Sequence, residues 1–186
     1  KNQVENIFIR IKKNKTIKIK TSMLCVSGGL NPDIHLFTQS KGLVKWDDKI
    51  LTFKPEKSFQ NTITLGSVSG NYEFEKLAKE INQKLSFIKN SNNINLNLEI
   101  SGPKGFSIKE IWETKNLKKS PWSKSFIDLQ NDVTTKDLKQ AIQEGFNRIE
   151  HLKRFTTNSM GTDQGKISSI NALGIASKLL KKNISD

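Results

Sequence analysis

Hydrophobic and polar positions alternate along the first twenty residues. The stretches ENIFIRI at 5–11 and TIKI at 16–19 place an apolar side chain at nearly every second position, and a Lys- and Asn-rich break separates them. A period of two is typical of β-strands, and two such runs around a polar break indicate a hairpin. The sequence therefore predicts a hairpin at the start of the chain.

A short apolar run follows and ends in glycine. Residues 21–26 (TSMLCV) lead into Gly28, Gly29 and an Asn-Pro pair. This order predicts a buried strand, extending the second one to 16–26, that closes in a tight turn where the glycines permit a positive φ.

The stretch ITLGSVSGNYEFEKLAKEINQKL, residues 63–85, predicts a strand, a glycine turn and a helix. We expect the strand near 62–66, a turn from Gly66 to Gly70, and a helix over 72–87. Apolar residues at helical spacing would form one face of that helix, and these are Phe74, Leu77, Ala78, Ile81 and Leu85.

The last third of the chain changes to helical periodicity. In DVTTKDLKQAIQEGF we expect Thr134 or Thr135 as N-cap and Gly145 near the C-terminal end of the helix. Its core stripe would consist of Leu138, Ile142 and Phe146. Two further helices fit RIEHLKRFTT and SSINALGIASKLLKK, so that three short helices would form a module over about 126–182.

Residues 86–125 contain no long periodic element, and KNLKKSPWSKS within them is typical of a basic connector. We therefore expect three parts: an α/β part at 1–90, a linker at 91–125 and a small helical domain at 126–186.

The composition narrows the classes of function. The 186 residues include 31 Lys and Arg against 18 Asp and Glu, a net charge of +13, which favours an anionic partner such as nucleic acid. However, the charges are spread along the chain, and the abundant Lys, Asn and Ile all have AT-rich codons. With no RNP, KH or helix-turn-helix pattern, we expect no nucleic-acid binding.

The residues needed for disulfides, metal sites, nucleophilic catalysis or membrane spans are also missing from the sequence. Cys25 is the single cysteine, so the chain can form neither an internal disulfide nor a cysteine cluster for metal. His35 and His151 have no third ligand at metal spacing, and Ser27 has no nucleophile-elbow pattern. No stretch is apolar enough to span a membrane, and the first residues show no signal-peptide pattern, so we expect a cytoplasmic protein without membrane contact.

One polar stretch carries many hydrogen-bond donors. HLKRFTTNSMGTDQGK, at 151–166, combines cations, hydroxyls and glycine amides, the groups that surround a bound phosphate. A solvated charged loop explains the same composition, and both interpretations stay open at this point. The candidate anion ligands are Lys153, Arg154, Thr156, Thr157, Thr162, Gln164 and Lys166.

The Gly66–Gly70 turn is a weaker candidate. A strand–turn–helix unit can direct backbone N–H groups at a phosphate. The spacing is not the G-x-G-x-x-G fingerprint, and an ordinary turn glycine explains it better.

The last third also contains several specific motifs: F-I-D-L-Q-N-D-V-T, E-G-F, E-H-L-K-R-F-T-T and T-D-Q-G-K. These resemble the middle of the α subunit of heterotetrameric sarcosine oxidase. The earlier stretch VSGGLNPDIHLFTQSKGLVKWDDKILTFKP resembles the same subunit, with Leu30 where that family has Trp. The resemblance covers nearly the whole chain.

The resemblance implies a fold and a reaction. Residues 1–90 would be the end of a disulfide-reductase-like NAD-binding α/β domain, with the nucleotide fingerprint upstream and a folate-binding domain downstream. Residues 126–186 would be a module like bacterioferritin-associated ferredoxin, without the four cysteines of its [2Fe–2S] cluster, so no cluster forms. The complex would oxidise sarcosine to glycine, transfer the one-carbon unit to tetrahydrofolate and form H2O2.

The resemblance also implies cofactors and partners. FMN would lie at the interface with the β subunit, with its phosphate at the 151–166 stretch, while FAD and tetrahydrofolate bind elsewhere in the complex and γ and δ subunits complete it. The isolated chain would not be catalytic. The partial NAD site would consist of Gly28, Gly29, Gly66, Ser67, Gly70 and Asn71.

Two alternatives remain: a subunit of a related amine, proline or opine dehydrogenase, and a basic nucleic-acid-binding module.

Overall fold

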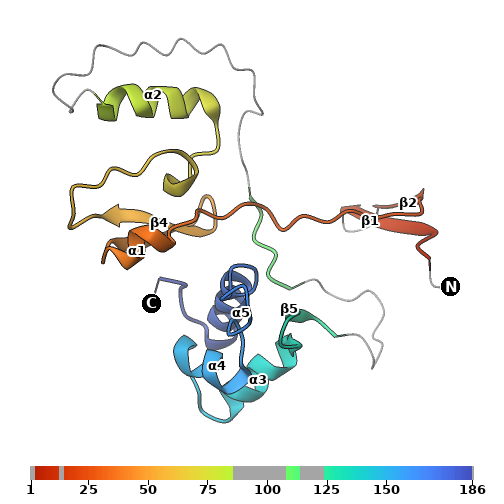
Figure 1. The fold of residues 1–186 in the computed structure, drawn as a ribbon. Coiled ribbons are helices and arrows are strands. Elements are labelled where there is room, and N and C mark those ends of the chain that lie inside the picture. The colour runs from red at the N-terminus through yellow and green to blue at the C-terminus, as the bar shows by residue number, and fades with distance from the viewer. Residues whose placement is uncertain (1–2, 13–14, 86–107, 114–123, 186) are drawn as a thin grey trace. The chain divides into compact units, whose positions relative to one another are not determined.

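The computed structural model describes residues 3–12, 15–85, 108–113 and 124–185 (Figure 1). It divides into two compact units, Lys1–Leu30 and Asn31–Asp186. The sequence pattern did not predict a boundary after Leu30. The mixed α and β composition expected from the sequence is confirmed, whereas the division into NAD-binding, linker and helical parts stays a prediction.

The first unit is a two-stranded antiparallel hairpin. Strands β1 (Asn6–Lys12) and β2 (Lys15–Lys20) pair in a register that places Ile7 opposite Ile19 and Ile9 opposite Ile17. The predicted hairpin is confirmed. Successive side chains of a strand point to opposite faces, so one face of this hairpin is aliphatic, and the other carries polar and cationic residues together with the exposed Phe8.

The strand expected over 21–26 is wrong. These residues have no regular structure, and the apolar side chains of Met23, Leu24 and Val26 are exposed. A strand is stable only where a neighbouring strand accepts and donates its backbone hydrogen bonds, and none of the described strands pairs with this stretch.

The second unit begins with a helix and a hairpin that the sequence analysis did not predict. A short helix, α1 (His35–Gln39), buries Phe37. Strands β3 (Leu43–Asp47) and β4 (Thr52–Lys57) then pair antiparallel. Across this hairpin, the rings of Trp46 and Phe53 stack edge to face with centroids 5.2 Å apart.

The strand expected at 62–66 is also wrong. That stretch is irregular and leads into a 3-10 turn, η1 (Gly66–Ser69), in which Gly66 and Gly70 have positive φ angles of 66° and 75°. Such angles end extended structure and favour glycine. The following helix α2 (Phe74–Leu85) confirms the predicted helix, and the expected positions 86 and 87 lie outside the described residues.

Residues 126–180 form a tiny hairpin followed by three helices. The hairpin pairs β5 (Phe126–Asp128) with β6 (Val133–Thr134), and its strands are too short to produce a periodic sequence pattern. The helices α3 (Thr135–Gln143), α4 (Ile149–Thr156) and α5 (Ser169–Leu180) confirm the three predicted helices, whereas their separation as a module stays a prediction. Their shared core consists of Ile127, Leu138, Ala141, Leu152, Ala172, Ile175 and Ala176.

Helix α3 shows why the helical prediction succeeded. Its N-cap is Thr134, whose N–H and hydroxyl both donate to Asp137 Oδ2 at 2.7 Å. At its other end, Gly145 has a φ of 94°, and Phe146 N–H donates to Ala141 O at 3.0 Å. These are local start and stop signals, readable from sequence alone.

Among the described residues, no helix is both long and apolar enough to cross a membrane.

Candidate anion-binding site

The last turn of α4 exposes two cations. Leu152 is fully buried in the helical core, so its neighbours Lys153 and Arg154 project into solvent. Cations at a helix C-terminus are favoured by the partial negative charge of the unpaired carbonyl groups. Neither side chain has an ion-pair partner within the ranges that the structure describes.

A cavity of about 620 Å³ lies between this turn and the loop that follows. It brings together three of the seven predicted anion ligands: Lys153, Arg154 and Gln164. The other lining residues, not identified from the sequence, are His35, Glu150, Ser159, Met160 and Gly161.

The other four predicted ligands do not line this cavity. The Thr156 hydroxyl donates to Leu152 O at 2.7 Å, and Thr157 ends the helix with a positive φ of 59°. Lys166 Nζ lies 3.8 Å from Asp33 Oδ2, and Thr162 is exposed on the loop. Helix-end hydrogen bonding therefore explains Thr156 without an anion.

The loop between α4 and α5 is held by a buried carboxylate that sequence reasoning missed. Asp128, at the end of β5, is 3% exposed. Its Oδ1 accepts hydrogen bonds from Gln130 N–H at 2.9 Å and Asn131 N–H at 3.3 Å. Its Oδ2 accepts from Ser159 N–H at 2.8 Å and from the Ser168 hydroxyl at 3.4 Å.

These donors keep Asp128 ionised. Burial alone would raise the pKa of its carboxyl group, but the N–H groups of Ser159, Gln130 and Asn131 outweigh burial and hold the pKa below the ordinary value. The sequence signal was present in the F-I-D-L-Q-N-D-V-T motif, where an Asp ends an alternating stretch before turn residues.

Around Asp128, small polar side chains fill the base of the loop. The Ser159 hydroxyl lies 2.9 Å from those of both Ser168 and Ser169, and Asn158 Nδ2 donates to it at 2.8 Å. Asn158 is 3% exposed, and its Oδ1 has no hydrogen-bond partner in the described part of the chain. This packing explains Gly165, because a side chain there would collide with Ser159 and Ser169.

The donor set fits an oxyanion in part. Lys153, Arg154 and Gln164 offer an ammonium, a guanidinium and an amide to one cavity, whereas Glu150 opposes an anion there. The C-terminal end of α4 gives no help from its dipole, so binding would depend on the two cations and the loop.

The predicted nucleotide turn has an internal partner instead. Gly66 N–H and Asn71 Nδ2 both donate to Glu80 Oε2, at 3.3 and 3.2 Å, and Lys84 Nζ lies 2.9 Å from Glu80 Oε1. Burial would raise the pKa of Glu80, but these donors lower it overall. A phosphate at this turn would have to displace the Glu80 carboxylate.

The remaining members of the predicted NAD site lie apart in the chain. Ser67 is exposed beside Gly66 in η1, and Gly70 packs against the Ile50 side chain. Gly28 and Gly29 belong to the other unit, in an exposed irregular segment where Gly29 has a φ of 102°. The NAD site stays a prediction.

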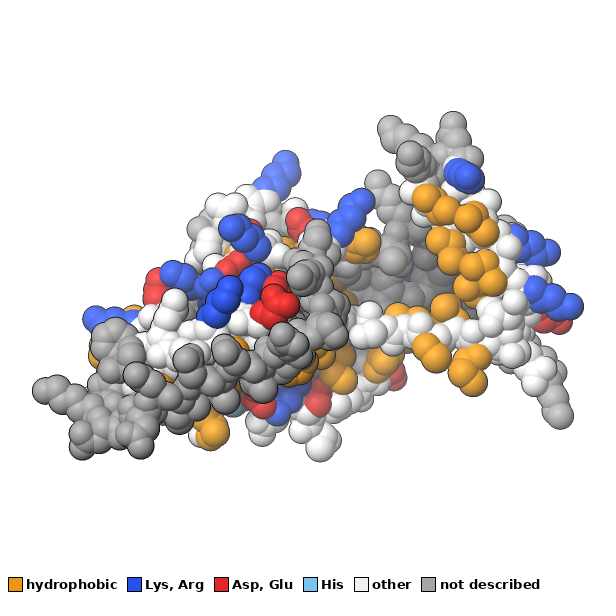
Figure 2. Space-filling model, turned by 90° about the horizontal axis from the view of Figure 1, so that it is seen from above, with side chains coloured by type: hydrophobic (Ala, Val, Ile, Leu, Met, Phe, Trp, Pro, Cys, Tyr) orange, Lys and Arg blue, Asp and Glu red, His pale blue; other side chains and the backbone are white. Residues whose placement is uncertain are grey.

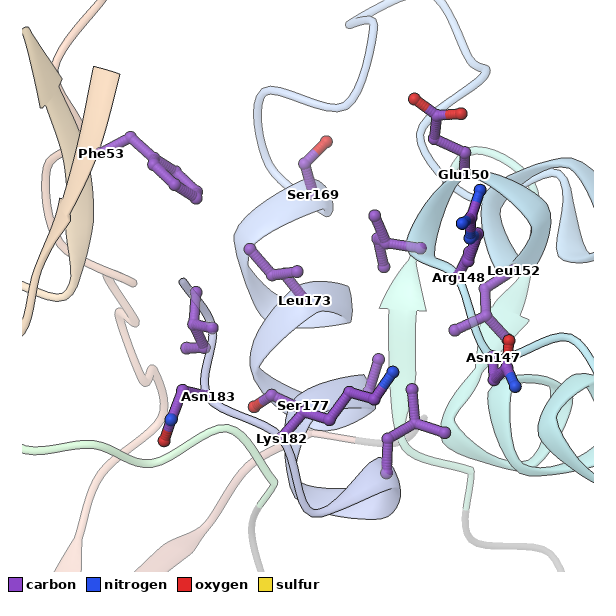
Figure 3. Close-up of a pocket in the computed structure, with 14 residues that line it drawn as sticks. Phe53, Asn147, Arg148, Glu150, Leu152, Ser169, Leu173, Ser177, Lys182 and Asn183 are labelled. Atoms are coloured by element: carbon purple, nitrogen blue, oxygen red, sulfur yellow. The ribbon is translucent and has the colours of Figure 1, made fainter. Parts of the chain in front are cut away.

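A second, more apolar cavity of about 810 Å³ borders α5 (Figure 3). Leu173 and Ser177 face it from α5, while Leu152 and Arg148 approach from α4 and its N-cap. Sequence reasoning assigned no site here, although Leu173 and Leu180 lie seven residues apart on one helix face.

Comparison with known proteins identifies similar sequences for most of the chain. Residues 122–186, which contain the whole loop and Asp128, match the sarcosine oxidase A3 domain family. Sarcosine oxidase subunit alpha from Corynebacterium sp. (strain U-96) is 28% identical over 186 residues, covering 88% of this chain and 18% of the relative. The resemblance to the sarcosine oxidase α subunit is confirmed.

Other comparisons point the same way. The sarcosine oxidase α subunit of Rhizobium meliloti (strain 1021) is also 28% identical, over 176 residues, covering 88% of this chain and 17% of the relative. The chain therefore spans less than a fifth of the length of these sarcosine oxidase α subunits.

A solved structure shares the fold. The crystal structure of L-proline dehydrogenase from P. horikoshii superposes with a TM-score of 0.59 and 22% identity, over 98% of this chain and 38% of that one. At this identity the likeness concerns the fold.

Proposed function

We propose that this chain forms part of the α subunit of a sarcosine oxidase complex, an oxidoreductase that converts sarcosine to glycine. The complex would transfer the released one-carbon unit to tetrahydrofolate and form H2O2. Support comes from the A3 domain match over 122–186 and from the similarity to α subunits over 88% of the chain.

Within that complex, the proposed task of this chain is to hold a phosphate at the interface with the β subunit. Arg154 and Lys153 would bind the phosphate of FMN, and Gln164 would donate a further hydrogen bond. When bound, FMN supplies redox chemistry, while this chain contributes binding and orientation and is not catalytic by itself. The residual NAD site, γ and δ subunits and cytoplasmic location belong to the same proposal.

The observation that carries this proposal is the cavity at the end of α4. It joins two cations that have no ion-pair partner among the described residues and the side-chain amide of Gln164, all within the A3 match. A charge-assisted hydrogen bond contributes about 1.5 to 3 kcal/mol once it is removed from water. In this proposal the two cations bind the phosphate of FMN, and the β subunit binds the rest of the flavin.

The decisive experiment is Arg154→Ala in a complex reconstituted with β, γ and δ subunits. We expect FMN retention after dialysis, followed by flavin absorbance, to fall by about tenfold to a hundredfold, because 1.4 kcal/mol corresponds to a factor of ten. Lys139→Ala is the matched control, since Lys139 is an exposed cation of α3 and lines neither cavity. Unchanged FMN content with normal assembly would refute the phosphate site.

The substrate is tested on the same complex. Oxidation of sarcosine in preference to proline, with glycine and H2O2 as products, would agree with the proposal. Preference for proline would instead favour the related dehydrogenase, whose fold this chain shares.

A further inference from the structure

The cavity wall that faces Arg154 is a loop, and the β5–β6 turn holds this loop in place. Cavity residues Ser159, Met160, Gly161 and Gln164 all come from the loop between α4 and α5. This loop has little regular structure of its own, so its position depends on what it contacts.

Three side chains of the β5–β6 turn bind this loop at three points. Asp128 Oδ2 accepts from Ser159 N–H at 2.8 Å, and Asn131 Nδ2 donates to Thr157 O at 2.8 Å. Gln130 Oε1 accepts from Asp163 N–H at 3.3 Å. The bonded positions are spread over the loop, before and within the cavity wall.

The loop backbone requires such restraint. Thr157, Ser159 and Gln164 have positive φ angles of 59°, 63° and 51°, although none is glycine. Non-glycine residues in this region persist only where surrounding contacts impose it. A side chain at Gly161 would displace Gln130, because a Cβ there would lie 3.0 Å from Gln130 Cβ and closer still to its amide oxygen.

Of the three side chains, Asp128 makes the most hydrogen bonds. Each of its oxygens accepts two hydrogen bonds, so one carboxylate closes its own turn and also fixes Ser159 and Ser168. Charge-assisted bonds of this kind are stronger than bonds between neutral groups, and more so when buried.

We infer that Asp128, assisted by Gln130, is the positioning residue of the anion site: it places the 159–164 loop so that Gln164 and the loop backbone meet the same oxyanion as Arg154. This inference rests on the proposed phosphate site. Asp128 itself does not line the cavity. N–H and O–H groups donate hydrogen bonds to both of its oxygens. Asp128 can therefore hold the loop in place without its own negative charge facing the bound anion.

The test measures inorganic phosphate binding to the full 186-residue chain at constant ionic strength, by NMR shifts of the Ser159, Gly161 and Gln164 amides. Asp128→Asn keeps the shape but replaces one acceptor oxygen with a donor. We expect about tenfold weaker phosphate binding, the effect of losing one such interaction. The Ser159 amide proton should also move upfield, since it would no longer donate to a carboxylate.

A destabilised control variant distinguishes a positioning role of Asp128 from a general effect on stability. Ile175→Val removes a methylene from the helical core, where Ile175 is 5% exposed, and lowers the melting temperature without touching the loop. It should leave phosphate affinity unchanged. If Asp128→Asn does not fold, Gln130→Ala decides, because Gln130 is exposed and its loss should weaken phosphate binding severalfold.

The outcomes separate the two proposals. Wild-type affinity in Asp128→Asn or, where that variant is unfolded, in Gln130→Ala overturns the positioning role and leaves the phosphate site intact. Equal loss in Ile175→Val also overturns it. Phosphate binding that is absent, or unaffected by Arg154→Ala, overturns the site and the positioning role together.

Discussion

Two aspartates of the helical module show how single carboxylates shape this chain. Asp137 accepts two hydrogen bonds from Thr134, three residues before it, at the start of α3. Asp128 instead binds Ser159, thirty-one residues away. The first interaction is local and contributes to helix stability, whereas the second determines where a distant loop lies.

The capping interaction of α3 can be tested by Thr134→Ala. We expect the free energy of unfolding to fall by about 1 kcal/mol, the usual cost of losing a Thr N-cap. Urea denaturation followed by circular dichroism measures it. Lys136→Ala, an exposed change in the same turn, should stay within about 0.5 kcal/mol of the wild type. Equal effects of the two changes would contradict a capping role.

At the scale of elements, an aromatic ring packs directly against helix α5 at a glycine. Gly174 is buried in the middle of α5, and a Cβ there would lie 2.7 Å from Trp112 Cε3. The Trp112 ring is also 6.4 Å from that of Trp46, between centroids. Glycine weakens a helix interior, so close approach of the indole is the reason for its presence.

Gly174→Ala should therefore displace Trp112. The gain of about 1 kcal/mol in helix propensity would be offset by lost ring packing. With Trp46 and Trp122 changed to Phe, Trp112 alone reports, and we expect its fluorescence emission to shift to the red. Asn171→Ala, an exposed change on the same helix, is the control. An unmoved emission maximum in Gly174→Ala would show that the ring is not held there.

For the whole molecule, the two units differ in how they bury apolar surface. The module at 126–180 has a contiguous core, whereas no described residue of Lys1–Leu30 is buried. Figure 2 shows hydrophobic side chains gathered at its right-hand end, over the β1–β2 hairpin. The exposed ones on the aliphatic face are Ile9, Ile11, Ile17 and Ile19.

Such a face promotes self-association. The double change Ile9→Lys and Ile17→Lys, at directly paired positions, should lower the concentration-dependent light scattering of the chain. Asn6→Lys with Thr16→Lys adds the same charge to the opposite face and should have a smaller effect. The melting of the helical module should not change in either variant. Equal loss of scattering in both would assign the effect to charge alone.

The sequence predicted the elements whose causes are local. The β1–β2 hairpin follows from Ile residues at alternating positions, and α3 follows from Thr134, its apolar stripe and Gly145. The strand predictions failed at 21–26 and 62–66, where apolar runs resemble strands but no described strand pairs with them. Strand formation depends on a distant partner, and the run itself carries no information about that partner.

In the candidate site, too, some features follow from the sequence and others only from the tertiary structure. The sequence by itself determined that Lys153 and Arg154 are exposed on a helix, because burial of Leu152 leaves its neighbours on the opposite face in solvent. Only the tertiary structure decided that Gln164 joins them while Thr156, Thr157, Thr162 and Lys166 do not. It also decided that Asp128 reaches Ser159 and that Glu80 already binds the Gly66 turn. A helix face follows from residues three or four positions apart, whereas the hydrogen-bond partner of a carboxylate depends on how segments far apart in sequence pack together.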